Sequence, residues 1–321
     1  LGGMGIIVLS LAILPFLGVG GMQLFKAEVP GPTADKLTPR ITQTAKILWG
    51  VYAGISLVEV ILLMFGGMSL FDALCHTFGT MATGGFSTKN SSIAAFDSAY
   101  IDYVITFFMI LAGTNFALHY RVVTGDWKAY FRNREFTFFL SIIGVAFLFI
   151  GLDTFFTRYD NPGNALQYTL FQVVSIVTTT GYGTADYELW SFSSQLMLFF
   201  LMFVGGCAGS TGGSLKVVRI YVVFKFIYSE FIRLMHPHAV VPVRIGDNTV
   251  PRDALTNMIG LFILFVLIFI FGSLVMSLLG LSMDSAMETV THGDPQALED
   301  GDTTYLTVAD GNGMMVSLIQ S

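Results

Sequence analysis

The chain has 321 residues, of which 54% are hydrophobic and only 12% are charged, and its mean hydropathy is +0.70. Soluble domains carry about 25% charged residues, so this composition excludes an ordinary soluble domain and predicts a membrane protein. The two cysteines, Cys75 and Cys207, exclude a disulfide framework.

In chain order, five stretches are apolar and long enough to cross a bilayer, which takes ~20 residues. They occupy positions 3–24, 45–65, 101–118, 137–156 and 255–281. A sixth apolar stretch, 192–228, is interrupted by glycines and carries some charge. Two shorter stretches, 70–81 and 165–177, are too short to cross, and we expect each to form a short helix.

Charge is segregated along the chain, which predicts its orientation. Three linkers hold 14 of the 16 basic residues: Lys26, Lys36, Arg40 and Lys46; Arg121, Lys128, Arg132 and Arg134; Lys216, Arg219, Lys225, Arg233, Arg244 and Arg252. By the positive-inside rule, these linkers should face the cytoplasm. The other side is mostly acidic and should raise the local cation concentration: Asp72, Asp97, Asp102, Asp153, Asp160, Asp186 and Glu188.

A glycine-containing loop occurs twice, each time directly after one of the short helices. Residues 82–88 read ATGGFST and residues 178–184 read TTTGYGT, so Gly85 aligns with Gly181 at an offset of 96 positions. Each repeat therefore consists, in chain order, of a membrane span, a short helix, a glycine loop and a second membrane span. Span 3–24 looks like the last helix of an earlier repeat, and 255–281 like the first helix of a later one.

This repeat predicts an all-α membrane protein in which helix–pore loop–helix hairpins surround a pseudo-four-fold ion pore that is incomplete in this chain. We divide the chain into the last helix of a first repeat plus a cytoplasmic linker (1–44), a second repeat (45–135), a third repeat with a glycine-broken last helix (136–253), the first helix of a fourth repeat (254–283) and an atypical acidic tail (284–321).

The two loops suit a desolvated cation. Irregular backbone survives at membrane depth only where it is buried in protein or lines a watery path. Glycine lets the chain adopt positive φ, and inward-facing carbonyls can replace an ion's hydration shell. The negative C-terminal end of each short helix favours a cation nearby. The predicted filter residues are Thr83, Gly84, Gly85, Phe86, Thr179, Thr180, Gly181 and Tyr182. The alternative is a tight extracellular turn, although TTGYG at 179–183 differs at only one position from the TVGYG of potassium-channel filters.

A glycine strip, residues 205–214 (GGCAGSTGGS), interrupts the sixth apolar stretch. Its poor helix propensity should break the helix, and unwound backbone at this depth must line a cavity. We interpret the strip as a gate below the filter; the alternative is close helix packing through small residues. The predicted gate residues are Gly205, Gly206, Ala208, Gly209, Ser210, Thr211, Gly212, Gly213 and Lys216. Lys216 would hold the strip closed, repel cations, or simply extend to the membrane interface.

We find no sequence signal for an enzyme: no nucleophile–base set, phosphate loop or cysteine pair stands out. Glu59 lies inside an apolar span, where an ionisable side chain is a functional hypothesis by default.

Several segments together resemble the Trk-type potassium uptake subunit of bacteria, within the Trk/Ktr/HKT superfamily. They are GGMGIIV at 2–8, GGMQLFKAE at 20–28, KLTPR at 36–40, both glycine loops and the glycine strip. The resemblance implies a multi-pass protein of the bacterial inner membrane that takes up potassium, with no covalent cofactor. It implies K+ at Thr83, Gly84, Thr179 and Thr180, with Gly85 and Gly181 as signature filter glycines. It also implies a homodimer that docks a cytoplasmic nucleotide-binding regulatory ring, and it leaves open whether the protein is a symporter or a channel.

Two departures qualify this expectation. The filter of the first repeat is missing, and after about Met283 the chain has seven acids, no Lys or Arg and no further span. We therefore expect a fragment whose tail is disordered or mis-spliced. Two of four filter segments could not close a pore alone. Potassium uptake through a gated filter is therefore our leading hypothesis, with a non-conducting subunit or scaffold, and a sodium-permeable or sodium-coupled transporter, as alternatives.

Overall fold

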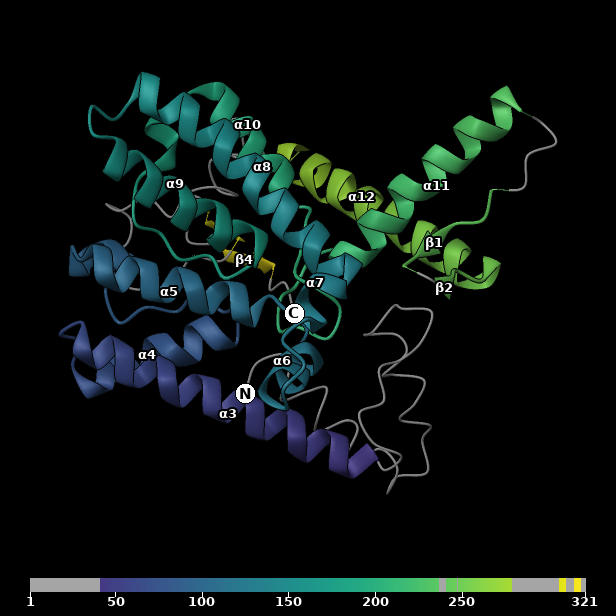
Figure 1. Ribbon diagram of the computed structural model, residues 1–321. Helices are drawn as coiled ribbons and strands as arrows, with labels where there is room; N and C mark the ends of the chain where they lie inside the picture. The colour runs from purple at the N-terminus through teal and green to yellow at the C-terminus, as the bar shows by residue number, and fades with distance from the viewer. Residues whose placement is uncertain (1–40, 237–240, 247, 279–305, 310–314, 319–321) are drawn as a thin grey trace.

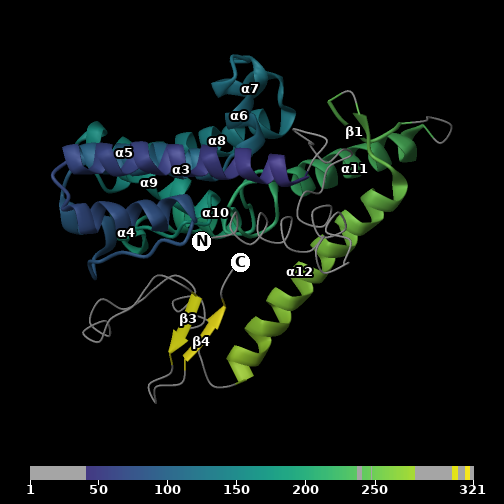
Figure 2. The same cartoon turned by 90° about the horizontal axis from the view of Figure 1, so that it is seen from below.

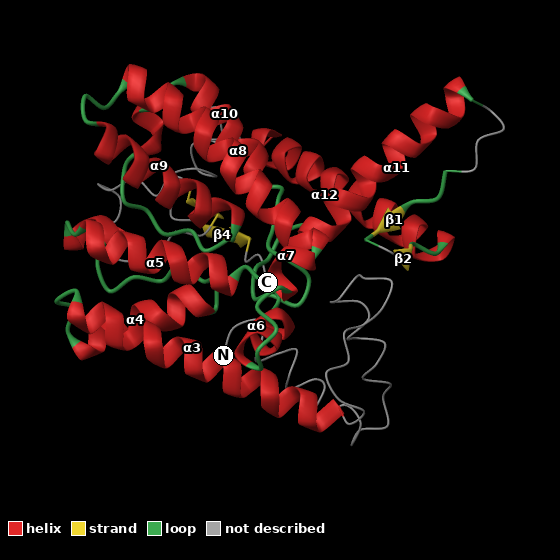
Figure 3. Cartoon of the chain, viewed as in Figure 1, coloured by secondary structure: helices red, strands yellow, loops and turns green. Residues whose placement is uncertain are grey.

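The computed structural model describes residues 41–236, 241–246, 248–278, 306–309 and 315–318, and these are almost entirely helical (Figures 1 and 3). The helical architecture confirms the predicted all-α class. The expected span 3–24 and most of the acidic tail lie outside the described residues.

The second repeat begins with α3 (Ile41–Phe65), which packs on the short helix α4 (Leu70–Met81). The chain then passes through the first glycine loop and the 3-10 helix η2 (Ser92–Phe96) into α5 (Ala99–Ala112), which packs on α4. Two short helices follow, α6 (Phe116–Val123) and α7 (Ala129–Arg132).

The third repeat has the same order. Helix α8 (Arg134–Thr157) packs on the short helix α9 (Pro162–Val177); the second glycine loop, η3 (Tyr187–Leu189) and α10 (Phe192–Leu201) follow. The glycine strip separates α10 from α11 (Val217–Met235), which packs on α12 (Arg252–Leu278). Between them lies the hairpin of β1 (Arg244–Ile245) and β2 (Asn248–Thr249).

Helix α12 slants away from the helices of the second and third repeats (Figure 2). In the tail, β3 (Leu306–Ala309) pairs antiparallel with β4 (Met315–Leu318), where the sequence had suggested disorder. These two strands are the only regular structure described beyond α12.

The two repeats meet where α5 packs on α9, so that α4, α5 and α9 run side by side (Figure 1). Buried residues from both repeats, including Ile105, Met109, Phe171 and Tyr182, form one core cluster here. The largely buried C-terminal half of α4 meets the second glycine loop here, since a Cβ on Gly79 would overlap the Tyr182 hydroxyl.

The outer faces of the long helices are apolar. Lys46–Phe65, Arg134–Thr157 and Ala254–Val275 are each long and apolar enough to cross a membrane. Exposed side chains on them include Leu57, Leu148 and Phe271. Because apolar surface of this extent is stable only against lipid or another protein, these helices present their faces to the bilayer.

Local signals explain why α4 and α9 start where they do. The Ser69 hydroxyl accepts the Asp72 amide at 3.1 Å and caps α4. The Asn161 side chain accepts the Gly163 amide at 2.8 Å, and Pro162 occupies the first turn of α9. Both short helices thus begin at side-chain caps, and both end at a glycine loop.

One expected span is not continuous. The sequence predicted a single helix over 101–118, but the chain bends by 102° between α5 and α6. Gly113 and Thr114 leave the helix, and the Asn115 side chain accepts the Ala117 amide at 2.8 Å, which caps the new helix α6. The last helix of the second repeat is therefore broken, as is that of the third.

Candidate functional site

The two glycine loops repeat each other's backbone hydrogen bonds at the 96-residue offset. In the first loop, the amides of Gly84 and Gly85 both donate to the Gly79 carbonyl, at 2.7 and 3.3 Å. In the second, the amides of Thr180 and Gly181 donate to the carbonyl at the equivalent position of α9, at 2.9 and 3.3 Å. Each loop thus turns N–H groups back onto the C-terminal end of its own short helix.

The loops also share a backbone torsion pattern. Thr83 has φ of 51° and Gly85 of 66°, while Thr179 has φ of 60° and Gly181 of 86°. The residue between each pair does not have positive φ. Both loops therefore have positive φ at the same two aligned positions. Threonine in the left-handed region is strained, so the surrounding contacts must hold it there.

The two loops touch. A Cβ added to Gly85 would overlap the Thr180 carbonyl oxygen, far inside van der Waals contact. Only glycine fits at this position, because both the positive φ and the neighbouring carbonyl exclude a side chain. The aligned segments of the two repeats therefore lie against each other in the interior, not on the periphery.

Tyr182 braces the pair of loops. Its side chain is fully buried, and its hydroxyl lies within hydrogen-bond distance of the His76 carbonyl, at 3.0 Å, and the Phe86 carbonyl, at 3.1 Å. Its own carbonyl accepts from the Ser175 hydroxyl at 2.7 Å. The predicted coordinating carbonyls of Phe86 and Tyr182 are therefore engaged within the protein. Each of these carbonyl oxygens has a second lone pair, so the role of Phe86 and Tyr182 as ion ligands stays a prediction.

The glycine strip forms a closed loop whose two ends meet. Helix α10 ends at Leu201 and α11 starts at Val217. Between them, the Gly205 amide donates to the Leu215 carbonyl at 2.9 Å, and Val204 pairs with the same residue in a parallel β-bridge. A Cβ on Gly205 would overlap the Gly213 carbonyl, so the narrow neck of this loop requires glycine.

The strip docks on the end of α5. The Cys207 amide donates to the Gly113 carbonyl at 2.8 Å, and the Thr211 hydroxyl donates to the Ala112 carbonyl at 3.0 Å. A Cβ on Gly206 would lie 2.9 Å from the Gly113 carbonyl oxygen. Glycine thus lets the strip approach the broken helix closely enough for its amides to reach the carbonyls left free there.

The equivalent threonines of the two loops connect the loops to the strip. The Thr83 hydroxyl donates to the Thr211 carbonyl at 2.9 Å, and the Thr179 hydroxyl accepts the Gly213 amide at 2.7 Å. The side chains of these two residues therefore point to the strip. A movement of the strip would break both hydrogen bonds.

Lys216 is buried, with 9% of its surface exposed, and its ammonium group lies among carbonyls of the strip. It donates to the Gly212 carbonyl and, at 3.4 Å, to the Ser210 carbonyl. A buried ammonium needs such partners, because desolvation of an unpaired charge is costly. The side chain does not extend to the membrane interface, which was one of the three alternatives for it.

One further contact of the strip was not predicted from the sequence. The carboxylate of Glu135, at the start of α8, accepts the Ala208 amide of the strip at 2.6 Å. The Asn115 side chain lies 3.0 Å from where a Cβ on Gly209 would stand. The only sequence signal for these contacts was the Gly113-Thr114-Asn115 triplet inside an otherwise apolar span.

Among the described residues, no group of three His, Cys, Asp or Glu side chains could hold a metal ion. Short helices that end in facing loops of alternating torsion, inside a set of lipid-facing helices, define a pore-loop membrane protein.

The chain belongs to the TrkH family of cation transport proteins, whose profile matches residues 1–291. The Trk system potassium uptake protein TrkH of Salmonella typhimurium is 43% identical over 295 residues, which cover 90% of this chain and 60% of that protein. The Trk system potassium uptake protein TrkG of Escherichia coli is 35% identical over 293 residues, which cover 90% of this chain and 60% of that protein.

The crystal structure of the potassium transporter TrkH from Vibrio parahaemolyticus matches with a TM-score of 0.76 at 36% identity, over 90% of this chain and 59% of that one. The chain spans about 60% of the length of the curated relatives it matches. Family and helices together identify a multi-pass protein of the bacterial inner membrane. The resemblance drawn from the sequence is confirmed.

Proposed function

We propose that this chain supplies two of the filter segments, and the gate, of a pathway for potassium uptake. The observation that carries the proposal is the pair of touching loops that have equivalent backbone hydrogen bonds and positive φ at aligned positions. Similarity to proteins named as potassium uptake proteins supports potassium as the ion. Two loops of independent function would have no reason to share this geometry at a fixed offset.

The ion would bind to carbonyl oxygens of Thr83, Gly84, Thr179 and Thr180. The amides next to these carbonyls are tied to α4 and α9, so the loops present oxygens to the ion. The C-terminal ends of the two helices carry partial negative charge, which favours a cation at the point where it loses water. Gly85 and Gly181 allow the torsions that aim the carbonyls.

The glycine strip would act as the gate. Its hydrogen bonds with Thr83 and Thr179 support this role, because they join the strip to both loops. Lys216 would stabilise the closed strip through its hydrogen bonds to the Gly212 and Ser210 carbonyls. In the closed position the strip would occlude the path. Because it is joined to the filter only by hydrogen bonds, a displacement would open the path without unfolding a helix.

The partners proposed for this chain are a second copy of itself and a cytoplasmic nucleotide-binding ring that regulates the gate. The exposed basic residues Lys128, Arg132 and Arg134, next to α7, suit contact with such a ring. The movement of α8, which starts here and carries Glu135 against the strip, would then reach the gate.

Growth of a bacterium that lacks potassium uptake tests the function. Because two of four filter segments could not close a pore alone, the chain is tested in a full-length chimera in which TrkH of Salmonella typhimurium supplies the remaining segments. We expect this chimera to restore growth at low potassium and Gly181→Ser within it to make the flux less selective against sodium. Gly183→Ala is the matched control, because Gly183 has open space for a Cβ and needs no positive φ.

Normal membrane insertion without rescue would favour the non-conducting scaffold and overturn the proposal. Rescue that depends on sodium would favour the sodium-coupled alternative. Rescue with an unchanged permeability ratio in Gly181→Ser would refute the filter assignment.

A further inference from the structure

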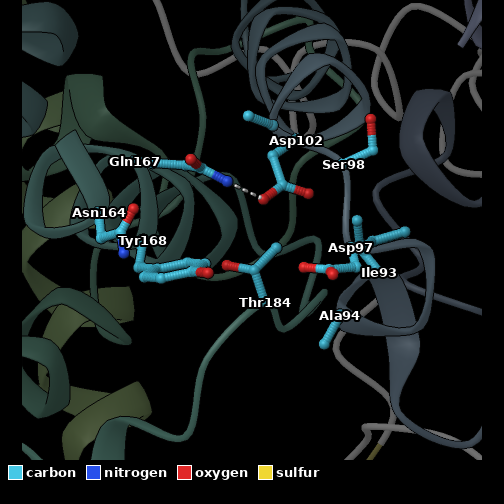
Figure 4. A pocket seen from close by; sticks show the side chains of 10 residues that line it. Ile93, Ala94, Asp97, Ser98, Asp102, Asn164, Gln167, Tyr168 and Thr184 are labelled. Atoms are coloured by element: carbon cyan, nitrogen blue, oxygen red, sulfur yellow. Dashed lines mark hydrogen bonds between the residues drawn. The ribbon is translucent and has the colours of Figure 1, made fainter.

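A polar cavity of about 350 Å³ lies between the two repeats, outside the filter and the strip. Its walls come from η2, the start of α5, the start of α9 and the residue that closes the second glycine loop, Thr184 (Figure 4). At roughly 30 Å³ per water molecule, this is room for an ion together with water. The carboxylates of Asp97 and Asp102 and the Thr184 side chain converge on this space.

Asp102 is the most deeply placed charge in the cavity, with 4% of its surface exposed. One carboxylate oxygen accepts the Gln167 amide at 2.8 Å, and the other has no hydrogen bond from a described residue. Asp97 lies at the open rim, at the end of η2. Within the described part of the chain, neither carboxylate forms an ion pair. Two carboxylates that share one cavity repel each other unless a cation neutralises them.

Thr184 provides independent evidence for a ligand. The residue is 92% buried, since 8% of its surface is exposed, and its hydroxyl oxygen has no hydrogen-bond partner among the described residues. A buried hydroxyl without a partner is unfavourable, so such a group normally meets water or a ligand. It lines the same cavity as the two carboxylates.

We propose that this cavity binds a hydrated divalent cation of the Mg²⁺ class, held by Asp97 and Asp102 through its water shell. Mg²⁺ gives up water reluctantly and commonly binds through one or two carboxylates with several waters retained. Oxygen ligands from Asp, Asn164, Gln167 and Thr184 suit a hard cation. Only two acidic side chains line the cavity, which is too few for a fully dehydrated site.

The position of the cavity implies what the ion does. Gly183, next to Thr184, donates to the Ser92 hydroxyl at 3.2 Å, and its carbonyl accepts the Ala94 amide at 3.2 Å. The end of the third-repeat filter loop is thus already tied to η2 of the second repeat. An ion between Asp102 and Thr184 would fasten the same joint, and this inference does not require that the chain conducts.

The test is thermal unfolding of the purified chain in lipid nanodiscs with increasing MgCl₂, with choline chloride keeping the ionic strength constant. We expect a saturable rise in the unfolding midpoint, because a ligand that binds only the folded state stabilises it. Asp102→Asn and Asp97→Asn should each raise the half-saturating Mg²⁺ concentration at least about tenfold. Asp160→Asn, an exposed acid outside the cavity, should leave it unchanged.

Each other outcome counts against the site. If KCl at matched ionic strength raises the unfolding midpoint equally, the stabilisation comes from a monovalent cation or from charge screening and not from a divalent ion. An undiminished Mg²⁺ response in both Asp97→Asn and Asp102→Asn would move the ion elsewhere. If Asp102→Asn does not fold, Asp97→Asn alone decides, because Asp97 is exposed and its loss creates no buried defect.

Discussion

The hydrogen bond between Thr179 and the glycine strip offers the sharpest test of the gate. Thr179→Val keeps the shape of the side chain but removes the oxygen that accepts the Gly213 amide at 2.7 Å. Gly213 is buried, so its N–H would be left without a partner while the strip is docked. A buried donor that loses its partner costs about 1–3 kcal/mol. The open population should therefore rise by about 5- to 150-fold.

Cys207 reports this opening without any need for conduction. It lies in the strip, is fully buried, and shares the chain with only one other cysteine, Cys75. In a Cys75→Ser background, the rate at which a small thiol reagent modifies Cys207 should follow the open fraction. We expect Thr179→Val to raise this rate by about the same 5- to 150-fold factor.

Thr106→Val is the control, since the same substitution there removes a hydroxyl that donates to the Asp102 carbonyl within its own helix, at 2.7 Å, and does not touch the strip. It should change the Cys207 rate little. Equal rates in Thr106→Val and Thr179→Val would show that the hydroxyl of Thr179 does not hold the strip, and the gate proposal would lose its link to the filter.

Three further changes test other parts of the site. Gly85→Ala should unfold at lower temperature and lose ion selectivity, because its Cβ would meet the Thr180 carbonyl and its φ is 66°. Gly183→Ala should behave like the wild type. Equal thermal unfolding midpoints for the two variants would refute the requirement for glycine at position 85. Lys216→Met should speed Cys207 modification, because the strip loses charge-assisted hydrogen bonds, and a slower reaction would contradict this. Glu59 is fully buried and neither carboxylate oxygen has a partner in the described structure, so Glu59→Leu should unfold at higher temperature; a lower midpoint would indicate that the carboxyl is used.

The features predicted most accurately from the sequence are those in which the backbone conformation itself requires a particular residue type. Glycine at 85 and 181 is required by positive φ, and a short helix before each loop follows from a stretch too short to cross a membrane. Such features can be predicted because one residue determines them locally. The predicted break at the glycine strip belongs to the same kind, since ten residues of poor helix propensity do not remain helical.

Features that depend on distant partners were missed. The break between α5 and α6 was missed because most of 101–118 is apolar, and the triplet Gly113-Thr114-Asn115 was interpreted as part of one continuous span. The contact of Glu135 with the strip joins residues 73 positions apart, and no periodicity indicates it. The cavity at Asp102 likewise needs both repeats in place before its carboxylates converge.

The two helix breaks stabilise each other. A helix inside a membrane can break only where the freed backbone groups find partners. The end of α5 leaves the carbonyls of Ala112 and Gly113, and these accept the Thr211 hydroxyl and the Cys207 amide of the strip. Each break therefore supplies partners for the other, and neither would be stable alone. If the strip leaves this position, both sets of groups lose their partners together, and water must take their place. Opening and hydration of this region should consequently be one event, which ties the gate proposed in the third repeat to the helix break in the second.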